Sequence, residues 1–252
     1  MSAGFLRSAR RPLRPDPKPS LRVGGLTALS TTDYPGRLAA VIFCQGCPWR
    51  CGYCHNPHLL PRQCSNGIEW SEIAAFLERR RGLLDAVVFS GGEPTLHAGL
   101  PAAVREVKNM GFAVGLHTAG VYPRRLQEVL PLLDWVGMDI KAPFEDYANI
   151  TGIAGSGERA LESMRQVIAS GVDHEFRTTV HPALHSRDAI LDVARTLQFH
   201  GARRFVLQEF RAQGCGEVRL NTEAPAQPLD PALLHAVSSR FEMFEVRGST
   251  FS

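Results

Sequence analysis

The chain has 252 residues, of which 44% are hydrophobic and 21% charged, and it carries a net charge of +3. This length and composition are typical of a globular protein with room for one α/β barrel or two small domains. No apolar run is long enough to span a membrane and no segment has the pattern of a secretory signal, so we expect a cytoplasmic protein without a membrane partner.

The N-terminal segment is rich in arginine and proline. Residues 1–24 hold six of the 28 basic residues and one of the 25 acidic residues, which leaves 22 basic and 24 acidic side chains in the rest. Such a near-neutral body does not favour binding to nucleic acid. We expect residues 1–22 to be a disordered basic tail, because prolines recur along them and they show no amphipathic periodicity. Residues 23–252 are expected to form a single domain.

Short apolar runs alternate with helical stretches along the rest of the chain. In order, we expect a strand at 38–43, a helix at 70–80, a strand at 86–89, a helix at 100–109, a strand at 113–116, a helix at 123–130, a strand at 135–140, a helix at 157–169, a strand at 175–180, a helix at 187–199, a strand at 204–210, a helix at 231–240 and a final strand at 243–246. This alternation predicts parallel βαβ units. About six units are too few for a closed eight-stranded barrel, so we expect an α/β fold with a partial, open TIM-like barrel. Its site should lie at the carboxyl ends of the strands.

Four of the six cysteines lie within eleven residues, between Cys44 and Cys54. Inside this run Cys47, Cys51 and Cys54 have the spacing C-x3-C-x2-C. A [4Fe–4S] cluster ordinarily takes four cysteines, so three thiolates would leave one iron open to another ligand. A cluster that acts on a bound molecule needs that open position, whereas a simple electron carrier does not. Cysteines gathered in this way also fit a reducing cytoplasm better than a disulfide framework does.

The same run can be divided into two C-x2-C pairs, as in a zinc knuckle. Zinc sites usually separate such pairs by many residues, and only three separate these. A non-catalytic metal-binding or electron-carrier module is therefore the alternative from another functional class. Cys44 ends a strand, where we expect it to be a buried small apolar side chain, with tuning of the cluster as the second interpretation. Cys64 and Cys215 are isolated and are expected to be core or surface thiols.

Polar motifs follow several of the predicted strands. Gly91-Gly92-Glu93 comes after the second, where paired glycines let the backbone approach a ligand and Glu93 adds a carboxylate, although a plain tight turn would look the same. Asp139 and Lys141 end the fourth strand and point to the same side by alternation, either toward a ligand or as a surface ion pair.

The fifth strand and its end add further polar candidates. Arg177 lies in a largely apolar strand, and a guanidinium there needs a carboxylate or a ligand. His181 ends this strand and is either a ligand contact or an ordinary loop histidine.

Taken together, these residues resemble the radical S-adenosylmethionine (SAM) superfamily. Within it they are similar to the activating enzymes of glycyl radical enzymes, and most of all to those of anaerobic ribonucleoside-triphosphate reductase. The similarity covers about residues 23–210 and rests on four motifs in the expected order: Asp33-Tyr34-Pro35-Gly36, the run from Cys44 to Asn56 that ends Cys-His-Asn, Gly91-Gly92-Glu93 and Asp139-Ile140-Lys141.

The resemblance implies a ligand set and a reaction. Cys47, Cys51 and Cys54 would bind the [4Fe–4S] cluster, whose open iron would chelate SAM. Tyr53 would lie beside the adenine, Gly91, Gly92 and Glu93 would hold the methionine amino group, and Thr118, Asp139, Lys141 and Arg177 would complete the cofactor site. One electron would cleave SAM, and the resulting 5′-deoxyadenosyl radical would take a hydrogen atom from a glycine of the partner. The implied partner is anaerobic ribonucleotide reductase, with a flavodoxin or ferredoxin as electron donor.

Two positions depart from the pattern of the family. The third predicted strand ends in His117-Thr118, where the best-known activating enzymes have Asp-Thr and the acid is thought to help bind a cation, so we expect no cation there. Cys44 stands where relatives often have an uncharged residue other than cysteine. A radical SAM enzyme that acts on a small molecule, such as a 7-carboxy-7-deazaguanine synthase, also has a Gly-Gly-Glu turn and is the alternative within the superfamily.

Overall fold

The structure is a computed structural model that describes residues 20–63, 66–222 and 229–248. One sheet of eight strands runs through it in the order of the sequence, from β1 to β8. The strands are β1 (Val23–Ser30), β2 (Ala39–Cys44), β3 (Ala86–Gly91), β4 (Ala113–Thr118), β5 (Trp135–Asp139), β6 (Asp173–Val180), β7 (Arg204–Glu209) and β8 (Met243–Arg247). All neighbours from β2 to β8 are parallel, and β1 pairs antiparallel with β2.

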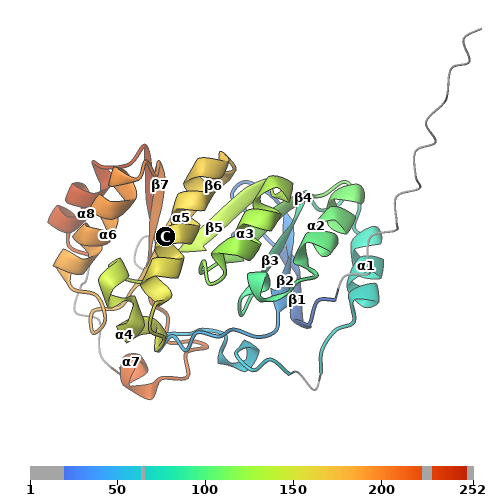
Figure 1. The fold of residues 1–252 in the computed structure, drawn as a ribbon, viewed down its shortest axis with the longest axis horizontal. Coiled ribbons are helices and arrows are strands. Elements are labelled where there is room, and N and C mark those ends of the chain that lie inside the picture. The colour runs from blue at the N-terminus through green and yellow to red at the C-terminus, as the bar shows by residue number, and fades with distance from the viewer. Residues whose placement is uncertain (1–19, 64–65, 223–228, 249–252) are drawn as a thin grey trace, which may run out of the picture.

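Helices connect successive parallel strands and cover one face of the sheet (Figure 1). The helices are α1 (Trp70–Glu78), α2 (Leu100–Asn109), α3 (Pro123–Val129), α4 (Tyr147–Thr151), α5 (Ser156–Ser170), α6 (Arg187–Phe199), α7 (Val218–Thr222) and α8 (Pro231–Ser238), with short 3₁₀ helices η1 (Pro57–Leu59), η2 (Pro94–Leu96), η3 (Leu130–Leu132) and η4 (Phe144–Asp146). The α/β class and the open barrel expected from the sequence are confirmed. The final strand expected at 243–246 is confirmed as β8, so the sheet has seven parallel strands where about six βα units were expected.

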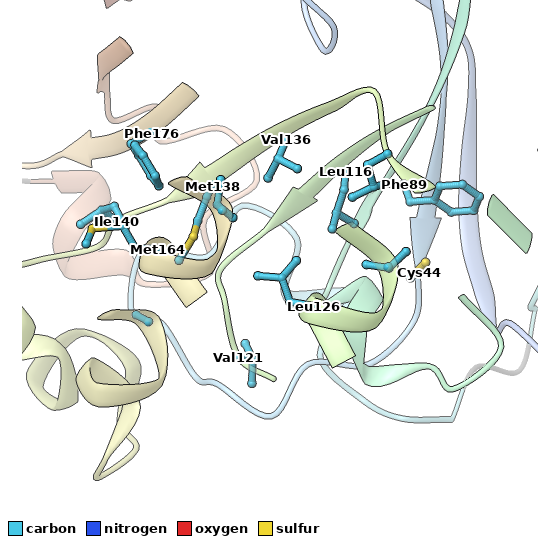
Figure 2. Close-up of a cluster of buried hydrophobic side chains, with 14 of the residues drawn as sticks. Cys44, Phe89, Leu116, Val121, Leu126, Val136, Met138, Ile140, Met164 and Phe176 are labelled. Carbon is cyan, nitrogen blue, oxygen red and sulfur yellow. The ribbon is translucent and has the colours of Figure 1, made fainter. Parts of the chain in front are cut away.

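The main hydrophobic core lies between the sheet and its helices. Alternate residues of each strand point to it, such as Ile42 of β2, Phe89 of β3 and Leu116 of β4, which are fully buried and stand in register with one another. Figure 2 shows this core, to which Met164 of α5 also contributes. Trp135 and five other buried residues form a second, smaller cluster that shares no buried residue with the main core. Both faces of the central strands are buried, and the sequences of these strands are therefore nearly continuous apolar runs, as is usual in parallel sheets.

Strand β1 was not predicted from the sequence. It contains Gly24 and Gly25, which are poor strand residues, and most of its side chains are partly exposed because it lies at one edge of the sheet. Just before it, Leu21 is buried and the Arg22 carbonyl accepts a hydrogen bond from the Gln45 backbone N–H at 2.8 Å. The folded body therefore includes residues that precede position 23. The expected tail otherwise falls on residues 1–19, outside the described residues.

Among the described residues, no helix combines the length and apolar character that crossing a membrane requires.

Candidate active site

The carboxyl ends of strands β3 to β6 and the loop after β2 enclose a cavity of about 180 Å³. This is the edge at which α/β barrels assemble their sites. Ten of the eleven site residues predicted from the sequence line it: Cys47, Cys51, Tyr53, Cys54, Gly91, Gly92, Thr118, Asp139, Lys141 and Arg177. Glu93 is the eleventh, and its side chain does not line the cavity.

The cysteine loop is held in place by backbone hydrogen bonds. The N–H groups of Gly46 and Cys47 donate to the carbonyls of Leu59 and Leu60, at 2.7 and 3.1 Å. On the other side, Arg50 N–H donates to the Thr151 carbonyl at the end of α4, at 2.8 Å. The three cysteines are consequently positioned by segments on both sides of the loop.

The three thiols have the arrangement that a multi-iron cluster needs. Within residues 20–63, 66–222 and 229–248, no three His, Cys, Asp or Glu side chains lie close enough together to hold one metal ion. Cys47, Cys51 and Cys54 instead border a common cavity, as a cluster requires, because its thiolates bind separate iron atoms. Burial raises the pKa of Cys47 to about 12, with the charge of Glu93 adding to the effect, so iron binding must displace a proton there.

Cys44 and Cys215 do not line this cavity. Cys44 is fully buried and points into the main core, as Figure 2 shows, which confirms the expectation of a small apolar side chain. Cys215 is buried as well, with its sulfur 3.7 Å from the Gly52 carbonyl oxygen. Cys64 lies outside the described residues.

Gly91 and Gly92 allow two backbone segments to approach each other. Gly91 has a φ of +113°, and a Cβ there would lie 2.4 Å from the Cys44 nitrogen. A Cβ on Gly92 would lie 2.4 Å from the Gly46 carbonyl oxygen. The sequence suggested that these glycines make room for a ligand. The structure shows that they also make room for the backbone that leads into the cysteine loop.

Glu93 is fully buried and is held by donors from its own protein. Its carboxylate accepts hydrogen bonds from the Thr95 N–H (3.1 Å) and hydroxyl (2.6 Å), the Thr118 hydroxyl (2.8 Å) and the Ala119 N–H (3.0 Å). Burial raises the pKa of Glu93, and these hydrogen bonds oppose the rise. The side chain thus joins the turn after β3 to the turn after β4, both of which border the cavity.

Asp139 and the two buried cations Lys141 and Arg177 form a charged group in the cavity wall. Arg177 Nε lies 3.1 Å and Lys141 Nζ 3.5 Å from the Asp139 carboxylate oxygens. The Lys141 and Arg177 side chains are only 10% and 9% exposed, whereas the Asp139 side chain between them is 39% exposed. Burial alone would raise the pKa of Asp139, but the charges of Arg177 and Lys141 hold it below its usual value. Two cations and one anion face the cavity, which leaves a net positive charge suited to a carboxylate.

Tyr53 lies against this charged group, with Lys141 Nζ 5.4 Å from the centre of its ring. Burial would lower the pKa of Lys141, but Tyr53, Cys51 and Asp139 raise it well above its usual value. The lysine is therefore a permanent cation between the aromatic ring and the carboxylate.

His117 lines the cavity as a neutral ring. Its Nε2 lies 2.9 Å from the Asp33 carbonyl oxygen and 3.2 Å from a guanidinium nitrogen of Arg177, and its Nδ1 lies 3.3 Å from the Ser90 hydroxyl. Burial lowers the pKa of His117 to about 3, and the positive charge of Arg177 adds to this effect. A neutral imidazole therefore stands where a carboxylate would supply a negative charge to a cation.

The low pKa of His117 predicts a loss of stability in acid. The His117 imidazole is protonated near pH 6.5 in the unfolded chain but only near pH 3 in the folded chain. Its contribution to the free energy of unfolding is therefore fully present above pH 6.5 and is lost as the pH falls. From pH 7 to pH 5 the free energy of unfolding should fall by about 2 kcal/mol through this group alone. Urea unfolding of the wild type and of His117→Asn at both pH values measures it, because the variant should lack this part of the loss. Equal losses in the two proteins would contradict the assignment.

Several lining residues were not predicted as site residues, among them Trp49, His55 and Asn56. His55 stacks on Phe210, with ring centres 5.5 Å apart, and its Nε2 lies 2.9 Å from the Arg211 carbonyl oxygen. Its position directly after Cys54 was the available signal. His181 is buried, with Nε2 at 3.0 Å from the Leu220 carbonyl, and does not line the cavity, so the interpretation as a structural loop histidine is confirmed.

A second cavity, of about 700 Å³, adjoins the first and shares His55, Arg177 and Thr179 with it. Its lining includes Thr31, Thr32, Asp33 and Pro35 after β1, together with residues at the ends of β7 and β8. Arg247 of β8 is anchored here by two hydrogen bonds to the buried Glu175 carboxylate, at 2.7 and 3.0 Å. The inner cavity is thus reached through a wide space between the two edges of the open barrel.

Comparison with known proteins agrees with this geometry. Residues 41–207 match the sequence family described as the radical SAM superfamily. A Methanocaldococcus jannaschii protein named as a glycyl-radical enzyme activating enzyme is 34% identical over 183 residues, which cover 70% of this chain and 75% of the relative. The pyruvate formate-lyase-activating enzyme of Clostridium pasteurianum is 29% identical over 185 residues, covering 70% and 76%.

A solved structure shows the same fold. The crystal structure of a domain of pyruvate-formate lyase-activating enzyme from Bacteroides vulgatus matches with a TM-score of 0.51 and 16% identity, and the match covers 65% of this chain and 99% of that domain. At this level of identity the match concerns the arrangement of helices and strands alone.

Proposed function

The chain belongs to the radical SAM superfamily and, within it, to the activating enzymes of glycyl radical enzymes, and from this premise we propose that its partner is anaerobic ribonucleoside-triphosphate reductase. It is an enzyme of a family that uses a [4Fe–4S] cluster and SAM. The observation that supports radical SAM chemistry is the cavity in which three thiols from one loop face Asp139, Lys141 and Arg177. When bound, the cluster supplies the electron that splits SAM and releases the 5′-deoxyadenosyl radical.

We propose the following roles for the residues of this cavity. Cys47, Cys51 and Cys54 hold the cluster, and Tyr53 lies beside the adenine of SAM. The backbone of Gly91 and Gly92 binds the methionine amino group, while Glu93 acts through the turn that it holds. Thr118, Asp139, Lys141 and Arg177 complete the site, and the excess positive charge of the last three residues suits the SAM carboxylate.

We propose that the adjoining cavity receives a segment of the protein substrate. Its volume of about 700 Å³ and its position between the two edges of the sheet would admit a polypeptide segment that carries the target glycine. His55, Arg177 and Thr179 line both cavities and would lie where that segment meets SAM. A segment seated there would also exclude water from the radical.

The choice of anaerobic ribonucleotide reductase rests on the motif set of residues 33–36, 44–56, 91–93 and 139–141 described above. Pyruvate formate-lyase is the competing partner, because activating enzymes for it are among the relatives. We further propose a flavodoxin or ferredoxin as electron donor, and a cytoplasmic location.

The experiment is activation of purified partners under anaerobic conditions. The reconstituted protein, SAM and a reductant are incubated with the reductase or with pyruvate formate-lyase, and electron paramagnetic resonance (EPR) detects a glycyl radical. We expect the signal with the reductase and none with a reductase whose radical-site glycine is replaced by alanine. A signal with pyruvate formate-lyase alone would reject the proposed partner, and SAM cleavage without a radical on either enzyme would favour a small-molecule substrate.

A further inference from the structure

Trp49 lies in the cysteine loop, between Cys47 and Cys51. Its side chain is fully buried, yet it borders the inner cavity together with both of these cysteines. Its indole Nε1 finds no hydrogen-bond partner among the residues that the structure describes. Buried donors in folded proteins are almost always paired, because an unpaired one loses its hydrogen bonds to water without compensation. We therefore expect the indole N–H to donate to an acceptor that the described residues do not supply.

The surroundings of Trp49 narrow the choice of acceptor. The nearby carbonyls of Cys47 and Trp49 already accept from the Arg50 guanidinium, at 2.7 and 3.1 Å. The indole ring meets the ring of Tyr147 edge to face, with centres 5.8 Å apart and planes at 75°. Tyr147 is itself fully buried, and its hydroxyl accepts from the Lys141 N–H at 2.9 Å. The indole is thus packed in one orientation beside the cysteines.

We propose that the Trp49 indole N–H donates a hydrogen bond to a sulfur atom of the bound cluster, on the side held by Cys47 and Cys51. Thiolate and sulfide sulfurs are the acceptors that this cavity gains when the cluster binds, and Trp49 borders it between two of the ligands. Hydrogen bonds to the sulfurs make a cluster easier to reduce, because they stabilise the negative charge that the electron adds. Trp49 then tunes the potential at which the enzyme accepts its electron. This inference depends on the cluster and not on which partner the enzyme activates.

The test is the substitution Trp49→Phe, which keeps an aromatic ring and removes the donor. Anaerobic redox titration, followed by EPR of the reduced cluster, should give a more negative midpoint than in the wild type. At a fixed potential the ratio of reduced to oxidised cluster should fall by up to about tenfold, which corresponds to about 59 mV for one electron. Iron and sulfide analysis of both proteins ensures that equal clusters are compared.

Trp135→Phe is the matched control. Trp135 is also buried and its Nε1 is also without a partner among the described residues, but it belongs to the second hydrophobic cluster and does not line the cavity. The same change of side chain at this site should leave the midpoint where it is. An equal shift in both variants would assign the effect to lost packing and overturn the proposal.

A second measurement uses the wild-type protein alone, so it does not depend on whether a variant can bind the cluster. Wild-type protein with ¹⁵N-labelled tryptophan is produced in deuterated medium, and electron–nuclear double resonance of the reduced cluster should detect a coupled indole nitrogen and its deuteron. An N–H directed at the ring of Tyr147 instead would give no such coupling and an unchanged midpoint in Trp49→Phe, and that result rejects the hydrogen bond. Neither measurement involves a glycyl radical enzyme, so failure here leaves the proposed partner untouched.

Discussion

Replacing Cys51 with alanine should reduce the formation of 5′-deoxyadenosine to the level measured without protein. Cys51 is one of three thiols that border the inner cavity, and two thiolates cannot retain a cluster that needs three. The variant should also lose its iron, because retention of the cluster depends on the same thiolate. Chromatography of the SAM cleavage products and chemical iron analysis after anaerobic reconstitution measure both effects.

Cys44→Ala is the control for this prediction. Cys44 belongs to the same run of the sequence, but its side chain lies in the main core and away from the cavity. Its replacement should leave iron content and SAM cleavage close to those of the wild type, at a modest cost in stability. Loss of iron in both variants would instead support the arrangement of two C-x2-C pairs around a metal.

Replacing Glu93 with alanine should destabilise the protein by about 3 kcal/mol or more, because two backbone N–H groups and two hydroxyls would lose their buried acceptor. Glu93→Gln should cost less, about 1–3 kcal/mol. Its amide oxygen can still accept from Thr95 and Thr118, but its NH₂ group would face the Ala119 N–H, and two donors cannot pair. Urea unfolding of the cluster-free proteins gives both values.

The same pair of variants tests how Glu93 serves the site. If the carboxylate acts by joining the turns after β3 and β4, Glu93→Gln should bind SAM with nearly wild-type affinity at temperatures where it is folded. An affinity for SAM reduced tenfold or more in Glu93→Gln, together with unchanged stability, would show that the carboxylate contacts the ligand directly.

Much of the fold could be predicted because several of the parallel strands are short and largely apolar. Strands β3, β4 and β5 are such runs between helices of ordinary length, and this alternation leaves few arrangements other than a parallel sheet. Strand β1 escaped prediction for the opposite reason. It is an edge strand with two glycines, and its pairing with β2 is decided by contact with the finished sheet.

The local pattern of the chain determined the chemistry of the cluster. Cys47, Cys51 and Cys54 lie within eight residues, and this spacing predicts that the three thiols bind one cluster. The residues at strand ends could be placed at one edge of the sheet by the same reasoning, since parallel strands carry their carboxyl ends to the same side.

Only the tertiary structure decided which of these polar side chains face the cavity and which serve the protein. Glu93 and Asp139 are both carboxylates at strand ends, yet four donors from neighbouring turns surround the first, whereas two cations hold the second in the cavity wall. The unpaired indole of Trp49 and the neutral ring of His117 arise in the same way. Hydrogen bonding and pKa depend on atoms that are distant in the chain and meet only after folding, so no local pattern encodes them.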